Sequence, residues 1–390
     1  MSSLDPIRQD GVVYKRLGEV ASYSNSRVEA IELDETNFVG VDNLLPNRRG
    51  KTNAIYRSNT ARLTRYEIGD ILLGNIRPYL KKVWRATDSG GCSGDVLAVR
   101  ISSTGEPTLI SEFVYYLLSS DEFFAYNMRH AKGAKMPRGS KEAILKFRIP
   151  IPPVSVQWEI VRMLDTFAEL ERELEAELEA RRLQLSHYRQ SLLLDDSLEP
   201  GRWGTLSEIG KVSMCKRIFK HETSALGEVP FYKIGTFGGQ PDAYISRAIY
   251  EKYRGQYPFP RRGEVLLSAA GTIGRAIPFD GADAYFQDSN IVWLANDESV
   301  VLNRYLFHWY QLAEWSTDGG TIQRLYNDNL RRTPIRIPSL EGQARIVETL
   351  DKLDALVNSP SFGLPAEISA RAKQYEYYRA KLLTFKEKVA

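Results

Sequence analysis

One segment of this chain limits its possible folds more than any other. From Trp158 to Leu193, apolar side chains recur at intervals of three and then four residues, and no Gly or Pro interrupts them. This spacing predicts a helix, roughly 54 Å long, that supercoils against a partner helix through a narrow apolar seam. A long amphipathic helix lying on a globular domain is the alternative, but its apolar stripe would be wider. The seam positions are Ile160, Leu164, Phe167, Glu171, Leu174, Leu178, Arg181, Leu185, Tyr188 and Leu192.

The partner helix is predicted within the same chain, because a second segment repeats the first. With Gln157 placed over Gln343, identical residues follow in both copies, and they resume after a four-residue insertion in the second copy. An internal repeat of this length decides the architecture. The matched pairs include Ile160 with Ile346, Val161 with Val347, Leu164 with Leu350, Asp165 with Asp351, Arg181 with Arg371, Tyr188 with Tyr378 and Leu192 with Leu382.

The globular segments repeat as well, and the stretches between their matching motifs diverge. We therefore predict an α+β protein with two tandem α/β domains separated by long helices that pair as an antiparallel coiled coil, in a pseudo-two-fold repeat. Pro360, Gly363 and Pro365 should break the second helix. The matching motifs are 17–20 with 206–209, 69–73 with 263–267, and 93–97 with 288–292. The predicted boundaries are 1–155 for the first domain, 156–196 for the first helix, 197–340 for the second domain and 341–390 for the second helix, broken near 359–365.

Two further helices are predicted inside the first domain. One runs from Ser111 to Met128, with Phe113 and Leu117 on its apolar side and Ser111 as its N-cap. A short one ends at Lys146, before a Pro-rich strap at 149–153 that closes the domain.

The composition suits a protein of the cytoplasm. No apolar run has membrane-spanning length, no signal peptide opens the sequence, and the 2 cysteines lack metal-type spacing. The net charge of +3 is unevenly placed, because both globular segments are basic whereas residues 158–199 are acidic. The basic segments are suited to a polyanion, which the acidic helix would repel.

Common catalytic motifs are absent from the sequence. The 4 histidines are scattered, and there is no G-x-x-x-x-G-K-[ST] loop for nucleotides and no N-P-P-[FY] tetrapeptide for a flipped base. No Asp or Glu stands two residues before a Lys, which removes the usual nuclease carboxylate–lysine pair. We therefore expect no catalytic residue, no metal and no cofactor in this chain.

The most specific candidate for binding nucleic acid is the turn at 74–82, which follows a predicted buried strand. Asn and Arg side chains there can read base edges, and lysines suit phosphates. Its counterpart is the Gly-rich turn at 268–275, where closely spaced glycines allow backbone N–H groups to approach phosphates. A surface turn with Tyr79 packed inward is the alternative. The candidate DNA-binding residues of these turns are Asn75, Arg77, Tyr79, Lys81, Lys82, Thr272 and Arg275.

A second candidate is the basic segment at 130–141, which corresponds to residues 319–332 in the second copy of the repeat. Solubilising charge on a loop is the alternative. The candidate residues are Lys132, Lys135, Arg138 and Lys141 in the first copy, and Arg324, Asn327, Asn329, Arg331 and Arg332 in the second. Weaker candidates, since any exposed loop can be basic, are Arg48, Arg49 and Lys51, and Lys216, Arg217 and Lys220.

The order of these features resembles the specificity (S) subunit of type I restriction–modification systems. The resemblance rests on GDILLGNIRPYLKK at 69–82, on VLLSAAGTIGRA at 265–276 with QDSNIVWL at 287–294, and on the two I-x-I-P helix entries. It implies that each domain is a target recognition domain that reads half of a bipartite sequence in double-stranded DNA. The paired helices would act as a ruler between the half-sites.

The resemblance also implies partner proteins. Two methyltransferase (M) subunits would dock mainly on the helices and carry S-adenosylmethionine, and two restriction or motor (R) subunits would join for cleavage. This chain would then be a non-catalytic subunit with no role at a membrane. The partner-binding candidates are Ile160, Leu164, Phe167, Leu174, Leu178, Leu185, Tyr188, Ile346, Leu350, Leu353, Tyr378 and Leu382.

Three other interpretations stay open at this point. The chain could serve a fused, type IIB-like system, in which the DNA reading is the same and the partners differ. It could be a divergent nuclease or a solitary methyltransferase, although the missing motifs argue against both. It could also be a coiled-coil adaptor whose domains bind protein or RNA.

Overall fold

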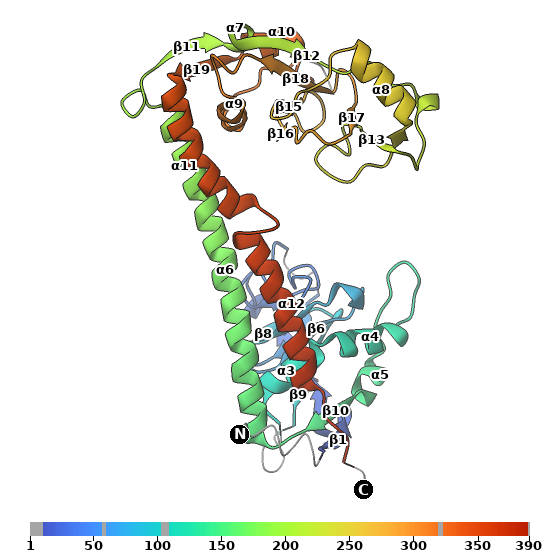
Figure 1. Cartoon of the computed structure of the whole chain (residues 1–390). Coiled ribbons are helices and arrows are strands. Elements are labelled where there is room, and N and C mark those ends of the chain that lie inside the picture. Colours follow the sequence, from blue (N-terminus) through green and yellow to red (C-terminus); the bar gives the residue numbers. More distant parts are fainter. Residues whose placement is uncertain (1–10, 57–59, 103–108, 319–322, 389–390) are drawn as a thin grey trace. The chain divides into compact units, whose positions relative to one another are not determined.

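The computed structural model describes residues 11–56, 60–102, 109–318 and 323–388. The chain forms two compact units: unit 1 comprises residues 1–174 and 368–390, and unit 2 comprises residues 175–367. Each unit contains one globular domain and a portion of both helical segments (Figure 1). The units therefore cut across the predicted boundaries, because each domain packs with the helical portions beside it.

Three small sheets are described in unit 1. Strand β1 pairs with β10, and the other two sheets have the orders β2-β9-β6-β7 and β3-β5-β8-β4. Strand β6 lies between β9 and β7 and is buried along its whole length, which explains its almost wholly apolar sequence. The bounds are β1 Val13–Arg16, α2 Leu17–Val20, β2 Ala21–Tyr23, β3 Arg27–Glu29, η1 Ala30–Glu32, β4 Phe38–Val39, β5 Arg62–Tyr66, β6 Ile71–Gly74, η2 Pro78–Leu80, β7 Val83–Arg85, β8 Gly90–Cys92, β9 Val96–Ile101, α3 Ser111–Leu118, α4 Asp121–Arg129, α5 Lys141–Lys146 and β10 Arg148–Ile151.

Unit 2 repeats this plan. Strand β11 pairs with β19, and the larger sheet has the order β12-β18-β15-β16, in the same pattern as β2-β9-β6-β7. The parallel pair β4 and β8 of unit 1 corresponds to the parallel pair β13 and β17 of unit 2. The bounds are β11 Gly201–Thr205, α7 Leu206–Ile209, β12 Gly210–Ser213, η3 Lys220–Glu222, β13 Val229–Tyr232, β14 Tyr244–Ile245, α8 Arg247–Gln256, β15 Val265–Ser268, β16 Ala276–Pro278, β17 Tyr285–Phe286, β18 Ile291–Asn296, α9 Asn303–Tyr310, α10 Asn327–Arg332 and β19 Pro334–Pro338.

The predicted first long helix is confirmed as α6, Val154–Leu194. The second is broken as predicted, into α11, Leu340–Asn358, and α12, Leu364–Leu383. Gly363 is required in this break, because its φ is +86° and a Cβ there would lie 2.6 Å from the carbonyl oxygen of Leu356. Pro365 falls in the first turn of α12, where a proline is tolerated.

The helices pair antiparallel inside each unit (Figure 1). In unit 1, the ring of Phe167 on α6 stacks on Tyr375 and Tyr378 of α12, with centroids 6.0 Å and 5.6 Å apart. In unit 2, Arg189 of α6 lies 3.7 Å from Asp354 of α11. Glu199, ten residues later, pairs with Arg345, nine residues before Asp354, so the two segments run in opposite directions.

A buried glutamine fixes the start of each helical segment against its domain. In unit 1, Gln157 accepts a hydrogen bond from the N–H of Ile110 at 3.0 Å. In unit 2, Gln343 accepts one from the N–H of Leu302 at 2.8 Å. Each also donates to the proline carbonyl five residues before it. The repeat in sequence is thus a repeat of the same contacts.

Two local predictions were wrong. The helix predicted from Ser111 to Met128 is two helices, α3 and α4, because Ser120 accepts a hydrogen bond from the N–H of Phe123 and caps a new start. The N-cap of α3 is Ile110, one residue before the predicted Ser111. Helix α8 was not predicted at all. None of the described helices is long and apolar enough to cross a membrane.

Candidate nucleic-acid interface

The two candidate loops of unit 1 lie against each other. The loop at 75–82 leaves the end of buried strand β6, and Ile76 forms an antiparallel bridge with Arg138. The backbone of Arg138 also forms an antiparallel bridge with the backbone of Lys132, and this bridge closes the basic segment into a tight hairpin. In unit 2, Arg324 bridges in the same way to Ala270 and to Asp318. The basic segments of the two copies, predicted to correspond, therefore form equivalent backbone bridges in the structure.

Matching hydrogen bonds show which residues are equivalent. The N–H of Asn75 donates to the carbonyl of Asp95, and the N–H of Ala269 donates to that of Asn290, both at 2.8 Å. The guanidinium of Arg138 lies 3.1 Å from the Asp95 carboxylate, and that of Arg324 donates to the Asn290 amide oxygen at 3.0 Å. Arg138 thus holds its hairpin to the turn before β9, and Arg324 holds the equivalent hairpin to the turn before β18.

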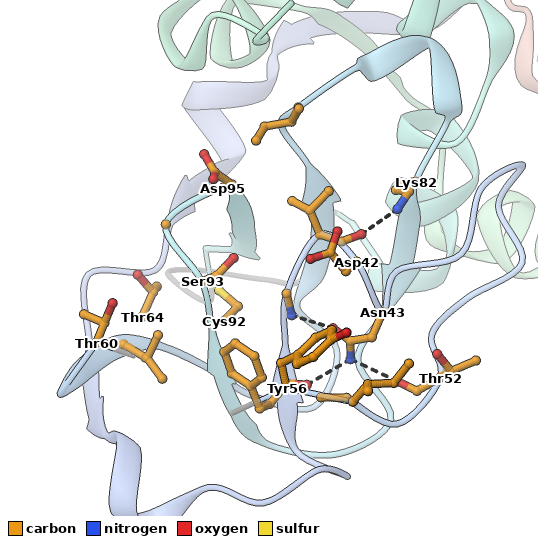
Figure 2. Close-up of a pocket in the computed structure, with 18 of the residues that line it drawn as sticks. Asp42, Asn43, Thr52, Tyr56, Thr60, Thr64, Lys82, Cys92, Ser93 and Asp95 are labelled. Carbon is orange, nitrogen blue, oxygen red and sulfur yellow. Dashed lines mark hydrogen bonds between the residues drawn. The ribbon is translucent and has the colours of Figure 1, made fainter. Parts of the chain in front are cut away.

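A cavity of about 790 Å³ opens beside these loops in unit 1 (Figure 2). Asn43 shapes one wall, because it accepts from the N–H of Gly40 and donates to two carbonyls of the same loop. Thr64 and Asp95 belong to another wall, and Tyr56 lines the cavity with 75% of its surface exposed. The lining combines apolar surface with many hydrogen-bonding groups.

The cations of this cavity come from separate elements. Arg27 on β3 donates to the hydroxyl of Thr64 at 3.1 Å, and Arg77 is exposed at a φ of +52°. Lys82 donates to the carbonyl of Val41 at 2.6 Å. Burial lowers the pKa of Lys82, an effect opposed by nearby Asp42. The cavity therefore combines cations from several elements with carboxylates and neutral donors and acceptors.

Unit 2 has a cavity of about 660 Å³ in the corresponding place. Arg217 lines it three residues before η3, just as Arg27 lines the first cavity three residues before η1. Lys220, Lys233 and Arg324 are also in its lining. Lys233 pairs with Asp242 at 2.8 Å. One cationic cavity per repeat is a pattern that sequence analysis did not predict.

The predicted residues of unit 1 divide into exposed and engaged side chains. Arg77, Tyr79, Lys135 and Lys141 are exposed, as DNA contact requires. Lys81 instead pairs with Asp121 at 2.6 Å, an acid that also binds Arg48. Asn75 is buried, so its side chain does not face solvent in this conformation, and its direct contact with DNA stays a prediction.

Several predicted residues of unit 2 form hydrogen bonds that stabilise the protein, although Arg275 among them is also exposed. Arg275 donates to the carbonyl of Phe237 at 2.7 Å, and Asn329 donates to Asp318 at 2.7 Å. Thr272 and Arg331 are exposed, although Arg331 pairs with Asp328 on its own helix, and Asn327 is half-exposed at the start of α10. The Gly-rich turn with Thr272 and Arg275 does not line the cavity among the described residues. Gly319, Gly320 and Thr321 lie outside the described residues.

Most predicted partner-binding residues are used inside the chain. Six of them are buried in the helical seams, against the domains and against one another, so these six offer no free surface in this conformation. Their binding to a separate subunit stays a prediction. Those buried are Ile160, Leu164, Leu185, Ile346, Leu350 and Leu382. Those half-buried are Phe167, Leu174, Leu178 and Leu353, and those more than a third exposed are Tyr188 and Tyr378.

Sequence reasoning missed Arg27, Arg62 and Tyr56 in the first cavity. One signal was available, since Arg27 and Arg217 each precede a glutamate by five residues.

The two cysteines are poor nucleophiles, because burial raises the pKa of Cys92 and of Cys215 to about 12. No cluster of metal-binding side chains occurs within the described ranges.

A duplicated fold with one cationic cavity per copy, and helices between the copies, defines a class of two-domain recognition proteins. Comparison with known proteins gives the family. The chain belongs to the type I restriction modification DNA specificity domain family, which it matches twice, over residues 10–180 and 200–370. Specificity subunits are non-catalytic components of type I restriction–modification systems.

The relatives agree with this assignment. The chain is 47% identical over 290 residues to a Haemophilus influenzae protein described as a type I restriction enzyme specificity subunit, covering 72% of this chain and 74% of that one. It is 28% identical over 264 residues to the EcoR124I/EcoR124II specificity subunit of Escherichia coli, covering 61% and 63% of the two chains.

Solved structures share the fold. A chain from a study of complex assembly and conformational transition of the type I R-M system matches with a TM-score of 0.65 and 19% identity, over 97% of this chain and 98% of that one. A type I S subunit from M. genitalium matches with a TM-score of 0.55 and 14% identity, over 95% and 96%. At these identities the likeness concerns the fold alone.

Proposed function

We propose that this chain is the DNA-recognition subunit of a type I restriction–modification complex, in which each unit reads one half of a bipartite target in double-stranded DNA. The observation that carries the proposal is the pair of cavities at equivalent places in the two units, each lined by arginine and lysine. Arginine reads guanine edges and lysine suits phosphates. The different linings of the two cavities favour two different half-sites.

The helices are proposed to set the distance between the half-sites. Helix α6 is continuous over 41 residues, and it would measure about 60 Å. Half-sites one helical turn apart on DNA are separated by ~34 Å, which a rigid element of this length can span. A matched change in the length of both helical segments should therefore alter the unspecified gap and leave both half-sites unchanged.

The partner subunits are proposed to dock on the outward faces of the helices. Apolar side chains are exposed there, including Leu183, which is 66% exposed, and Tyr377, which is 61% exposed. Such side chains are suited to a protein interface. We propose two methyltransferase subunits, which carry S-adenosylmethionine, and two restriction or motor subunits as the partners of this chain.

The test is to co-express the tagged chain with the methyltransferase encoded beside it and to map adenine methylation in genomic DNA. The expected result is a complex that modifies one split sequence. An insertion variant carries seven extra residues in α6 after Leu174 and seven in the break at 359–363. It should widen the gap only. Absence of a co-purifying methyltransferase, together with duplex DNA binding no better than that of an unrelated protein of equal charge, would contradict the proposal.

A further inference from the structure

The cavity of unit 2 holds one arginine whose position is fixed from both ends. The chain before Arg217 is anchored, because buried Tyr285 donates its hydroxyl to the carbonyl of Lys216 at 3.0 Å and Cys215 is buried. The side chain of Arg217 is tied at Nε to the carboxylate of Asp288 at 2.9 Å. The arginine is nevertheless 62% exposed, whereas Asp288 is only 15% exposed. An exposed guanidinium is thus held by a largely buried acid.

The acid is itself held by a strained turn. Ser289, the next residue, has a φ of +61°, a value that side chains other than glycine adopt at a cost. Its carbonyl accepts a hydrogen bond from Arg324 at 2.9 Å, and Arg324 also donates to the Asn290 amide oxygen at 3.0 Å. Arg324 therefore positions the turn, and the turn positions Asp288. Such strain is typical of sites where the direction of a side chain matters for function.

This arrangement favours one kind of ligand. Pairing through Nε leaves the Nη1 and Nη2 edge of the guanidinium directed away from Asp288, and that edge forms two parallel hydrogen bonds to adjacent acceptors. The carboxylate of Asp288 offsets the charge of the Arg217 guanidinium and weakens its attraction for a phosphate. It does not oppose a neutral base. Guanine presents such a pair of acceptors, O6 and N7, in the major groove.

We propose that Arg217, oriented by Asp288, reads a guanine in the half-site recognised by unit 2. This inference rests on the proposed function, and it adds a residue, a base and a positioning network to it. Unit 1 lacks the same device, because Arg27 donates to the hydroxyl of Thr64 and Ser93 stands where the repeat has Asp288. The two units therefore differ at equivalent positions, which suits an asymmetric target.

The experiment uses the complete complex with its methyltransferase. Methylation is first mapped for the wild type and for Arg217→Ala. The variant should accept any base at one guanine position of one half-site, and the other half-site should stay unchanged. Arg202→Ala is the matched control, since Arg202 pairs with Glu208 at 2.8 Å and is 56% exposed in the same unit but is not part of the described cavity lining. It should leave the whole motif unchanged.

A second measurement begins with the wild-type complex, so its main result does not depend on whether a variant folds. Replacing that guanine by 7-deazaguanine removes the N7 acceptor, and it should slow methylation by the wild-type complex at least about tenfold. It should slow the Arg217→Ala complex no further. Asp288→Asn should lower discrimination at the same position, because Arg217 loses its anchor.

Three results would overturn the inference. One is a half-site for unit 2 with no guanine on either strand. Another is a wild-type complex that tolerates 7-deazaguanine at every position. The third is an Arg217→Ala complex that loses activity evenly on all sites with an unchanged motif, because that result identifies a phosphate contact. A wild-type complex without any split target would instead refute the proposed function, and this inference would fall with it.

Discussion

Acid should destabilise unit 2 through one buried histidine. His308 of α9 is fully buried, and its Nε2 lies 2.7 Å from the carboxylate of Asp351 on α11. A carboxylate only accepts, so the neutral ring donates Nε2–H, and Nδ1 is left buried without a partner in the described part of the chain. Arg304 binds the same carboxylate, and Arg189 of α6 also faces the ring. Burial lowers the pKa of His308, and the two arginines lower it further, while Asp351 raises it.

The sign and size of the effect follow from linkage. The unfolded chain binds a proton at His308 with a pKa of about 6.5, and the folded chain binds it only at lower pH. Between those two pKa values the unfolded state holds more protons, so stability falls as the pH falls. From pH 6.5 to pH 5.5 the loss should be at most about 1 kcal/mol, the limit that applies when the folded ring stays neutral.

The test compares the wild type with His308→Gln. The amide of glutamine can keep the hydrogen bond to Asp351 but does not titrate, so the variant should lose this part of the pH dependence. Urea unfolding at pH 7.5, 6.5 and 5.5 gives the free energies, with the fluorescence of buried Trp293 and Trp309 as reporters of unit 2. Subtracting the variant from the wild type removes the other titrating groups.

Unit 1 supplies the control. At the equivalent position Tyr116 donates to Asp165 at 2.5 Å, and burial raises the pKa of Tyr116, so it does not titrate in this range. Tyr116→Phe should cost stability without changing its pH dependence. An equal pH slope in the wild type and in His308→Gln would refute the reasoning.

Two further predictions concern packing. Gln343→Ala should destabilise unit 2 by about 3 kcal/mol in urea, because it removes the three hydrogen bonds of a fully buried side chain. An unchanged midpoint would contradict the role of this glutamine. Gly139→Ala places a Cβ 2.4 Å from the Asn127 amide oxygen, so we expect a cost of about 1–3 kcal/mol and weaker methylation that depends on unit 1. Gly94→Ala is its control for stability, since a Cβ there meets nothing within 4 Å.

Patterns that repeat along the chain predicted the framework well. The heptad spacing located α6, the matching motifs identified equivalent strands, and the prolines located the break between α11 and α12. These features depend on neighbours a few residues apart, which is the range over which periodicity and backbone restriction act. The split between α3 and α4 could not be predicted in this way, because Ser120 as a cap looks like any serine inside a helical pattern.

The sequence also located the loops of the candidate site but not the roles of their side chains. Arg77 and Arg138 follow from a basic loop beside a buried strand. The ion pairs of Arg138 with Asp95 and of Lys81 with Asp121 could not be predicted from the sequence. Their acidic partners are many residues away, and any exposed acid could have taken the same place. Basic composition alone does not separate a cation that meets DNA from one that braces a loop.

The sequence by itself determined that this chain has two related domains, a long helix with a partner in the same chain, and no common catalytic motif. The tertiary structure decided which residues share a cavity, that Asn75 is covered, and that Arg217 is held by Asp288 on an exposed wall. The physical reason is that burial and ion pairing depend on the distances between residues far apart in the chain. Only the packed fold sets those distances.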